Sequence, residues 1–207
     1  MFYITSTPWW LKSIFPKGLT WKGNPEGNTL YLTFDDGPHP EITGFVLDQL
    51  AAANMKGTFF CIGENVERYP ETFARIKKEG HSVGNHTQTH PDGWKMQTTQ
   101  YLDEVKQADQ FIRSGLFRPP YGKITKKQAV SIYHEFPGMK IIMWTGVTGD
   151  FDTTKTGEWC AQTAIRFARP GSIMVMHDSE KAWPRLKIAL PEVLSFMADH
   201  GLKSVAL

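Results

Sequence analysis

Two adjacent carboxylates, Asp35 and Asp36, are the first residues in this sequence whose types and spacing indicate chemistry. They follow an alternating segment, residues 30–34, and precede a Gly-Pro breaker, which predicts a strand that ends at the acid pair. Like charges at the end of a core strand repel each other, and burial disfavours their ionised forms. We therefore infer a divalent metal held by one acid, with the other free for proton transfer. An Asp-Asp-Gly turn that only closes the strand is the structural alternative.

His86 and His90 form the second candidate group. On one helical turn, a spacing of four residues points both imidazoles the same way, close enough to share a metal. Two imidazoles and one carboxylate leave coordination positions open for water and substrate, which is typical of a catalytic metal site. Zn²⁺ suits this donor set, and Co²⁺ or Ni²⁺ would also fit. For the histidine spacing alone, a surface pair without a metal is the alternative.

The rest of the sequence predicts the elements that must position these side chains. Apolar segments predict about seven strands, with helical periodicity between them, at residues 30–34, 57–62, 81–86, 116–118, 139–145, 172–176 and 202–206. Continuous apolar strands that alternate with helices indicate a parallel sheet covered by helices. The predicted fold class is α/β, a single-domain distorted (β/α) barrel with about seven parallel strands and its active site at the C-terminal rim. An open doubly wound sheet is the alternative.

Helix boundaries carry their own signals. Pro70 and Gly80 bound one predicted helix, because proline favours the first turn and glycine the C-terminal end. Thr99 and Thr125 are predicted N-caps of two further helices. Pro191 predicts a kink or break in the last helix.

Polar residues follow five of the predicted strands, and in a barrel these strand ends share one rim. They are Asp35 and Asp36 after the first strand, His86 and His90 after the third, Arg118 and Tyr121 after the fourth, Asp150 after the fifth, and His177 after the sixth. Five separate strands that each deliver such groups to one rim are hard to explain by structure alone. The pattern therefore favours an active site.

The composition is that of an ordinary globular protein. The 207 residues carry a net charge of +2, too small to argue for nucleic acid, and no apolar run approaches the roughly 20 residues of a bilayer span. Cys61 and Cys160 are interpreted as buried free thiols. The N-terminus lacks the features of a secretory signal, so we expect a cytoplasmic monomer, with a periplasmic or cell-envelope location left open. We predict an N-terminal arm over residues 1–28, packed on a catalytic domain over residues 29–207.

Five short motifs resemble those of the polysaccharide deacetylases, carbohydrate esterase family four, and occur in that family's order. They are Thr33-Phe34-Asp35-Asp36-Gly37-Pro38, His86-Thr87-Gln88-Thr89-His90, Arg118-Pro119-Pro120-Tyr121-Gly122, Asp150-Phe151 and Val175-Met176-His177. The resemblance covers residues 29–207. It implies removal of N-acetyl groups from amino sugars in a glycan such as peptidoglycan or chitin.

The resemblance also implies a role for each motif residue. Asp36, His86 and His90 would hold the metal, and Asp35 would be the general base that takes a proton from water.

For the remaining motif residues, the resemblance implies supporting roles. The Tyr121 N–H would stabilise the oxyanion, and His177 would be the general acid that protonates the departing amine. Asp150 would orient His177, and Arg118 would fix Asp35 as an ionised base.

The fourth motif departs from the family pattern, since Val147 and Phe151 stand where many members carry an acid and a tryptophan. Loss of that acid would leave Arg118 with fewer anionic partners, and Asp152 is a candidate substitute. Phe151 and Val175 keep an apolar lining, which suits an acetyl methyl group. We expect these changes to affect substrate and rate more than reaction type.

Two other functions stay open at this stage. The same scaffold acting on a non-sugar amide is one, and a non-catalytic glycan-binding protein is the other. The retained first and third motifs argue against the former, and the complete set of metal and proton-transfer residues argues against the latter.

Overall fold

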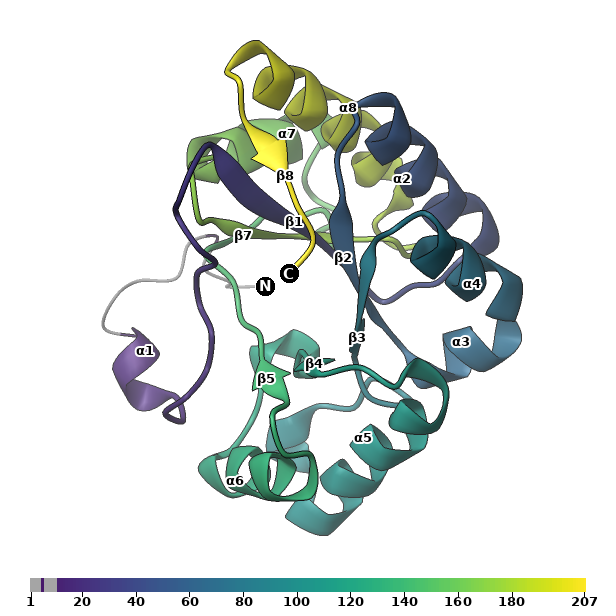
Figure 1. Cartoon of the computed structure of the whole chain (residues 1–207), viewed down its shortest axis with the longest axis vertical. Helices are drawn as coiled ribbons and strands as arrows, with labels where there is room; N and C mark the ends of the chain where they lie inside the picture. Colours follow the sequence, from purple (N-terminus) through teal and green to yellow (C-terminus); the bar gives the residue numbers. More distant parts are fainter. Residues whose placement is uncertain (1–4, 6–10) are drawn as a thin grey trace.

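The computed structural model of the chain describes Thr5 and residues 11–207, and a parallel sheet lies at its centre (Figure 1). The central strand β1 (Thr29–Asp35) pairs with β2 (Gly57–Cys61) on one side and β7 (Ile173–His177) on the other. The other strands are β3 (Ser82–Asn85), β4 (Leu116–Phe117), β5 (Lys140–Ile141), β6 (Gly146–Val147) and β8 (Lys203–Ser204).

The strand order is that of a barrel with one open link. The sheet runs β5-β4-β3-β2-β1-β7-β6, with β8 beside β1, and every pairing is parallel. Followed around the ring, β1 to β7 keep their chain order, and only β5 and β6 lack a mutual pairing in the part of the chain that the structure describes. This order confirms the predicted distorted (β/α) barrel over an open doubly wound sheet. The prediction of one strand over 139–145 is wrong, because β5 covers only Lys140–Ile141 of this segment and a separate edge strand, β6, begins at Gly146.

The N-terminal segment occupies the open link between β5 and β6. The Thr20 N–H donates to the Ile141 carbonyl at 2.9 Å, and the Thr20 carbonyl accepts from the Met143 N–H at 2.7 Å. The Thr145 hydroxyl donates to the Trp21 carbonyl at 3.1 Å. These bonds satisfy edge groups that closure of the barrel would otherwise pair.

The short helix α1 (Leu11–Ile14) precedes this segment. The division of the chain at residue 28 into an arm and a catalytic domain stays a prediction.

Both faces of β1 are buried, in two different environments. Leu30, Leu32 and Phe34 belong to the main core between the sheet and the outer helices. Tyr31 belongs to a cluster of the barrel interior, where Thr33 is also buried. Side chains alternate along a strand, so Asp35 falls on the interior face, after Tyr31 and Thr33.

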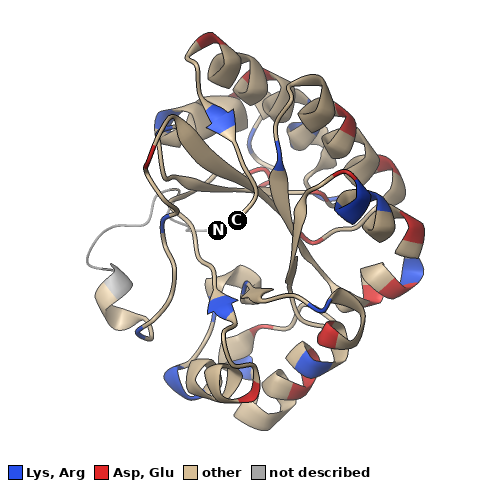
Figure 2. Ribbon diagram, in the orientation of Figure 1, with Lys and Arg blue, Asp and Glu red and all other residues tan. Residues whose placement is uncertain are grey.

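Helices surround the sheet, and their charged residues lie on the outside of the molecule while the strands are almost free of charge (Figure 2). The longer helices are α2 (Pro40–Ala52), α3 (Gly63–Arg68), α4 (Pro70–Lys78), α5 (Thr98–Ile112), α6 (Lys126–Glu135), α7 (Gly157–Phe167) and α8 (Trp183–Asp199). Cys61 and Cys160 are free and buried, which confirms their interpretation.

Most helix boundaries follow the predicted signals. Pro70 begins α4, and Thr125 caps α6 in a capping box with Gln128. The prediction of Thr99 as an N-cap is wrong, because α5 already begins at Thr98. Pro191 lies inside α8 without ending it, since the packing of the flanking turns outweighs one lost hydrogen bond.

Truncation of Leu32 tests the core. Leu32 is 0% exposed on the central strand, so we expect Leu32→Ala to lower the free energy of unfolding by about 2–5 kcal/mol. Urea unfolding followed by circular dichroism measures the change. Val130 on α6 is 67% exposed, and Val130→Ala should change the value by no more than about 0.5 kcal/mol. Equal effects of the two substitutions would contradict this description of the core.

Candidate active site

The base candidate Asp35 is held by a fully buried arginine. Arg118, which is 0% exposed, donates from Nη1 to Asp35 Oδ1 at 2.6 Å and to the Thr33 hydroxyl at 2.7 Å. Its other nitrogens donate to the carbonyls of Ile142 and Met143, each at 3.2 Å. The guanidinium therefore has four acceptors, and it fixes one oxygen of the Asp35 carboxylate.

These partners show what surrounds Arg118 in place of the acid that the fourth motif lacks at position 147. Val147 provides no charge, and the hydroxyl of Thr33 with two main-chain carbonyls surrounds the guanidinium instead. Burial lowers the pKa of Arg118, and the Asp35 carboxylate opposes that shift. Asp152 Oδ1 accepts from the Thr154 N–H and hydroxyl. Arg118 thus reaches a satisfied geometry without the acid that position 147 lacks.

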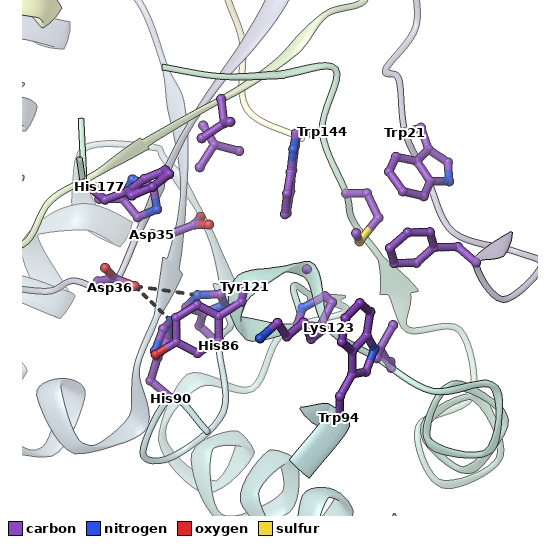
Figure 3. A pocket seen from close by; sticks show the side chains of 18 of the residues that line it. Trp21, Asp35, Asp36, His86, His90, Trp94, Tyr121, Lys123, Trp144 and His177 are labelled. Atoms are coloured by element: carbon purple, nitrogen blue, oxygen red, sulfur yellow. Dashed lines mark ion pairs between the residues drawn. The ribbon is translucent and has the colours of Figure 1, made fainter. Parts of the chain in front are cut away.

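Asp36 leaves the strand direction that Asp35 follows. Its φ of 81° is left-handed, and the Gly37–Pro38 peptide bond, one residue further on, is cis. Asp36 Oδ1 lies 3.2 Å from His90 Nε2 and 3.7 Å from His86 Nε2. Dashed lines mark these two ion pairs in Figure 3. That oxygen is buried without a hydrogen-bond partner among the described residues. A buried carboxylate oxygen that faces two imidazoles is the arrangement that a cation would satisfy.

His86 and His90 come together through a loop, so the predicted helical turn is wrong. Strand β3 ends at Asn85, and the chain then bends at Thr87 and His90, whose φ values are 66° and 60°. The two imidazole rings lie 4.9 Å apart between centroids. Thr87 stabilises the bend, because its N–H donates to Asn85 Oδ1 at 2.9 Å and its hydroxyl accepts from the His90 N–H at 3.1 Å.

The protonation and orientation of the two imidazoles suit metal binding. His86 Nδ1 lies 2.7 Å from the Arg118 carbonyl, an acceptor, so Nδ1 carries the proton and Nε2 keeps its lone pair toward Asp36. Burial, followed by the neighbouring His90, lowers the pKa of His86 well below its usual value, and burial also lowers the pKa of His90. Neutral rings with free Nε2 atoms are the form that binds metal.

The acid candidate His177 is coupled to Asp150. His177 Nδ1 donates to Asp150 Oδ1 at 2.7 Å, and the His177 N–H donates to Asp150 Oδ2 at 2.7 Å. Burial alone disfavours the imidazolium, but the Asp150 carboxylate outweighs it and raises the pKa of His177 to about 10. Asp35 and His177 are register partners on neighbouring strands β1 and β7. The base candidate and the acid candidate therefore stand side by side.

Tyr121 occupies the tight turn after Arg118. Its φ of 57° is left-handed, and its ring packs edge-on against His90 at 4.6 Å between centroids. The N–H groups of Gly122 and Lys123 donate to the carbonyls of the two prolines before Tyr121 and close the turn. The backbone of Tyr121 is thereby held next to the imidazole pair.

Asp178 is a structural residue of this site to which the five sequence motifs assign no role. Its carboxylate accepts from the Gly37 N–H at 3.1 Å and from the Thr43 hydroxyl. Its own N–H donates to the Asp35 carbonyl at 3.1 Å. Burial raises the pKa of Asp178 to about 7. These bonds tie the turn after Asp36 to the end of β7.

One cavity of about 850 Å³ is lined by six of the candidate residues, Asp35, Asp36, His86, His90, Tyr121 and His177, but not by Arg118 or Asp150. Figure 3 shows this cavity from close by. Asp35, Asp36, His86, His90 and His177 lie at one end of it. Residues that the sequence did not single out form the rest of the wall, among them Phe15, Trp21, Trp94, Lys123 and Trp144. For the three tryptophans among them, the only indication in the sequence was the high tryptophan content of the chain, seven residues. In the described part of the chain, no helix has the length and apolar content that crossing a membrane requires.

The coupling between His177 and Asp150 predicts a measurable titration. In protein freed of metal by a chelator, the His177 imidazole should titrate with a pKa of about 10, which heteronuclear NMR can follow. This folded-state pKa lies above the usual 6.5, so protonated His177 stabilises the folded state. Its contribution to the free energy of unfolding is complete below pH 6.5 and is lost as the pH rises through 10. Asp150→Asn should lower the pKa, since burial is then opposed only by the smaller effects of Asp36 and Asp35. A wild-type pKa near 6.5 would contradict the coupling.

Comparisons with known proteins agree with this geometry. The polysaccharide deacetylase family model matches residues 22–136. A peptidoglycan-N-acetylglucosamine deacetylase of Bacillus cereus is 30% identical over 183 residues, 85% of this chain, and this chain spans 66% of that relative's length. A chitooligosaccharide deacetylase of a Bradyrhizobium species is 37% identical over 72% of this chain and 70% of the relative.

A solved structure extends the similarity to the fold. The Bc1960 peptidoglycan N-acetylglucosamine deacetylase superposes with a TM-score of 0.86 at 27% identity, over 97% of this chain and 95% of the other. The residues of this chain that the family model matches include the acid pair, the two histidines and the Arg118 turn described above. The chain belongs to the polysaccharide deacetylase family.

Proposed function

We propose that this chain is a metal-dependent hydrolase that removes N-acetyl groups from amino sugars of a glycan, of the peptidoglycan or chitin type. The observation that carries the proposal is the cavity in which the unpartnered Asp36 oxygen faces two imidazoles, beside the Asp35 and His177 pair. The named relatives, peptidoglycan and chitooligosaccharide deacetylases, support the reaction type and the substrate class.

Asp36, His86 and His90 are the proposed metal ligands. Their ligand atoms lie within 4.8 Å of one another, and the donor set of two imidazoles and one carboxylate fits Zn²⁺, with Co²⁺ or Ni²⁺ as alternatives. When bound, such a dication supplies Lewis-acid activation of a water molecule and of the acyl carbonyl.

Asp35 is the proposed general base. Its Oδ1 accepts a hydrogen bond from Arg118, so Oδ2 is the oxygen that would receive the proton. Arg118 stabilises the negative charge on Asp35 and keeps the carboxylate available to remove a proton from the attacking water. The water oxygen then bonds to the acyl carbon, and the negative charge moves onto the acyl oxygen. The backbone N–H of Tyr121 is the proposed hydrogen-bond donor to that oxygen.

His177 is the proposed general acid. Its Nδ1–H is bound to Asp150, so the second ring proton, on Nε2, is the one that can be donated. The nitrogen of the acetamide receives this proton as the carbon–nitrogen bond breaks, and the products are acetate and a free amino sugar. The apolar side chains of Val147, Phe151 and Val175 line the cavity and are the proposed contacts of the acetyl methyl group. A cell-wall glycan would require the periplasmic or cell-envelope location that the sequence left open.

The metal site is tested by binding. We expect the purified, chelator-treated protein to bind one Zn²⁺ or Co²⁺ per chain by isothermal titration calorimetry. His90→Ala removes one donor and should weaken binding at least tenfold, the order of effect known for lesser changes around metal sites. His134 lies exposed on α6, so His134→Ala is the matched control and should bind as the wild type does. Identical titrations of both variants would contradict the proposed ligands.

The reaction is tested by acetate release. With Zn²⁺ or Co²⁺, the protein should release acetate from N-acetylglucosamine oligomers or from peptidoglycan. Asp35→Asn removes the base and should lower kcat by about 100-fold to 10,000-fold. Asp103 on α5 is exposed, so Asp103→Asn is the control and should keep full activity.

The outcomes separate the competing functions. Glycan binding without acetate release, with metal bound, would favour a non-catalytic glycan-binding protein. Hydrolysis of small amides in preference to every glycan would favour the non-sugar substrate.

A further inference from the structure

The proposed metal ligands come from two distant parts of the chain, and one short segment is bonded to both parts. Asp36 follows β1, whereas His86 and His90 follow β3. Residues 62–65, which run from the end of β2 into the first turn of α3, make hydrogen bonds to both neighbourhoods. We call these four residues the bridge segment.

Two main-chain bonds from the bridge segment hold the loop that carries the histidines. The Gly63 N–H donates to the Thr87 carbonyl at 2.9 Å, and the Glu64 N–H donates to the Gln88 carbonyl at 3.1 Å. A Cβ on residue 63 would overlap the Gln88 side chain, so glycine allows this close approach. The histidine loop therefore lies directly on the backbone of the bridge segment.

Two further bonds from the bridge segment hold the turn that carries Asp36. The Ile62 N–H donates to the Gly37 carbonyl at 2.9 Å, and Asn65 Nδ2 donates to the Asp36 carbonyl at 2.7 Å. Asp36 has a φ of 81°, which residues other than glycine keep only where the surrounding structure supports it. Asn65 supplies part of that support, because its amide bonds to Asp36 itself.

The peptide group between Asp36 and Gly37 is bonded at both edges. Its carbonyl accepts from Asn65, and its N–H donates to Asp178 Oδ1 at 3.1 Å. A peptide group is planar, so two bonds on opposite edges fix its rotation about the chain, and with it the ψ angle of Asp36. The direction in which the Asp36 side chain leaves the chain therefore depends on the Asn65 amide.

We propose that Asn65 is a positioning residue of the metal site, which directs the Asp36 carboxylate toward His86 and His90. The inference rests on the proposed function, in which Asp36 is a metal ligand. Asn65 does not line the cavity, so it acts through Asp36 and not on the substrate. Because the bridge segment also holds the histidine loop, the Asn65 bond keeps the carboxylate ligand in register with the two imidazole ligands.

Metal binding gives the first test. Asn65→Leu keeps the approximate size of the side chain but removes the donor, and it should raise the Kd of the chelator-treated protein for Zn²⁺ about tenfold, the size of effect known for groups that orient metal ligands. Asn65→Gln keeps an amide donor and should recover part of the affinity. Leu and Gln both favour a helix more than Asn does, so a weaker α3 cannot cause the loss.

A matched control separates the position from the type of substitution. Gln107 is exposed on α5, so Gln107→Leu makes the same exchange of an amide for an alkyl group and should leave the Kd unchanged. The visible absorption of bound Co²⁺ reports the arrangement of its ligands, and it should change in Asn65→Leu but not in Gln107→Leu. Wild-type affinity in Asn65→Leu, or an equal loss in Asn65→Leu and Asn65→Gln, would overturn the role of the amide donor.

Hydrogen exchange gives a second test that needs no metal. In the metal-free protein, the Gly37 N–H should exchange about 2-fold to 10-fold faster in Asn65→Leu, the range that corresponds to the loss of one hydrogen bond. The His86 N–H, which donates to the Cys61 carbonyl at 2.9 Å, is the internal reference and should keep its rate. Unchanged exchange at Gly37 would show that Asn65 does not hold the turn, and would overturn the proposal.

The two proposals fail in different ways. If the wild type binds no metal while Gly37 exchange still depends on Asn65, the proposed metal site is refuted and Asn65 holds the turn for structural reasons alone. If the wild type binds metal and releases acetate, and Asn65→Leu changes neither the Kd nor the Co²⁺ spectrum, the positioning role is refuted and the proposed function stands.

Discussion

The buried ion pair between Arg118 and Asp35 is the interaction on which the site depends. Two carboxylates on consecutive residues repel each other, and a buried guanidinium that neutralises one of them makes the pair tolerable. Loss of one partner from such a buried pair costs about 3–5 kcal/mol, because the remaining charge is left uncompensated. The same guanidinium donates to Thr33 of β1 and to the carbonyls of Ile142 and Met143, which follow β5. Arg118 itself follows β4, so its side chain connects the ends of three strands.

Backbone geometry gives the two acids different environments. Asp35 is the last residue of β1, so strand alternation directs it into the barrel interior toward Arg118. Asp36 has left-handed backbone geometry and faces His86 and His90 instead. One acid is thereby paired with a permanent cation, while the other keeps an oxygen without a partner. The division between proton transfer and metal binding that we propose follows from this local change of direction.

The open link of the barrel connects the fold to the shape of the cavity. Strands β5 and β6 do not pair with each other, and the segment around Thr20 and Trp21 bonds to Ile141 of β5 and to Met143 and Thr145 between the two strands. A closed barrel would have no place for this segment. Because it is there, the cavity gains a wall far from the reacting groups, and the acid, the base and the distal aromatic residues share one continuous space.

The sequence by itself determined the barrel, most of the strand ends and the residues gathered at the rim, because strand periodicity is local and parallel strands place their carboxyl ends at one rim. The end of the fifth strand is the exception, since β5 stops at Ile141. It did not determine how those residues meet. The bends at Thr87 and His90, the use of Thr33 as an acceptor for Arg118 and the approach of Trp21 to the wall opposite Trp94 were decided by the tertiary structure alone. The last two depend on contacts between segments far apart in the chain, which neither periodicity nor spacing encodes. The bends combine local bonds of Thr87 with a bond from a distant segment, since the Gly63 N–H donates to the Thr87 carbonyl at 2.9 Å.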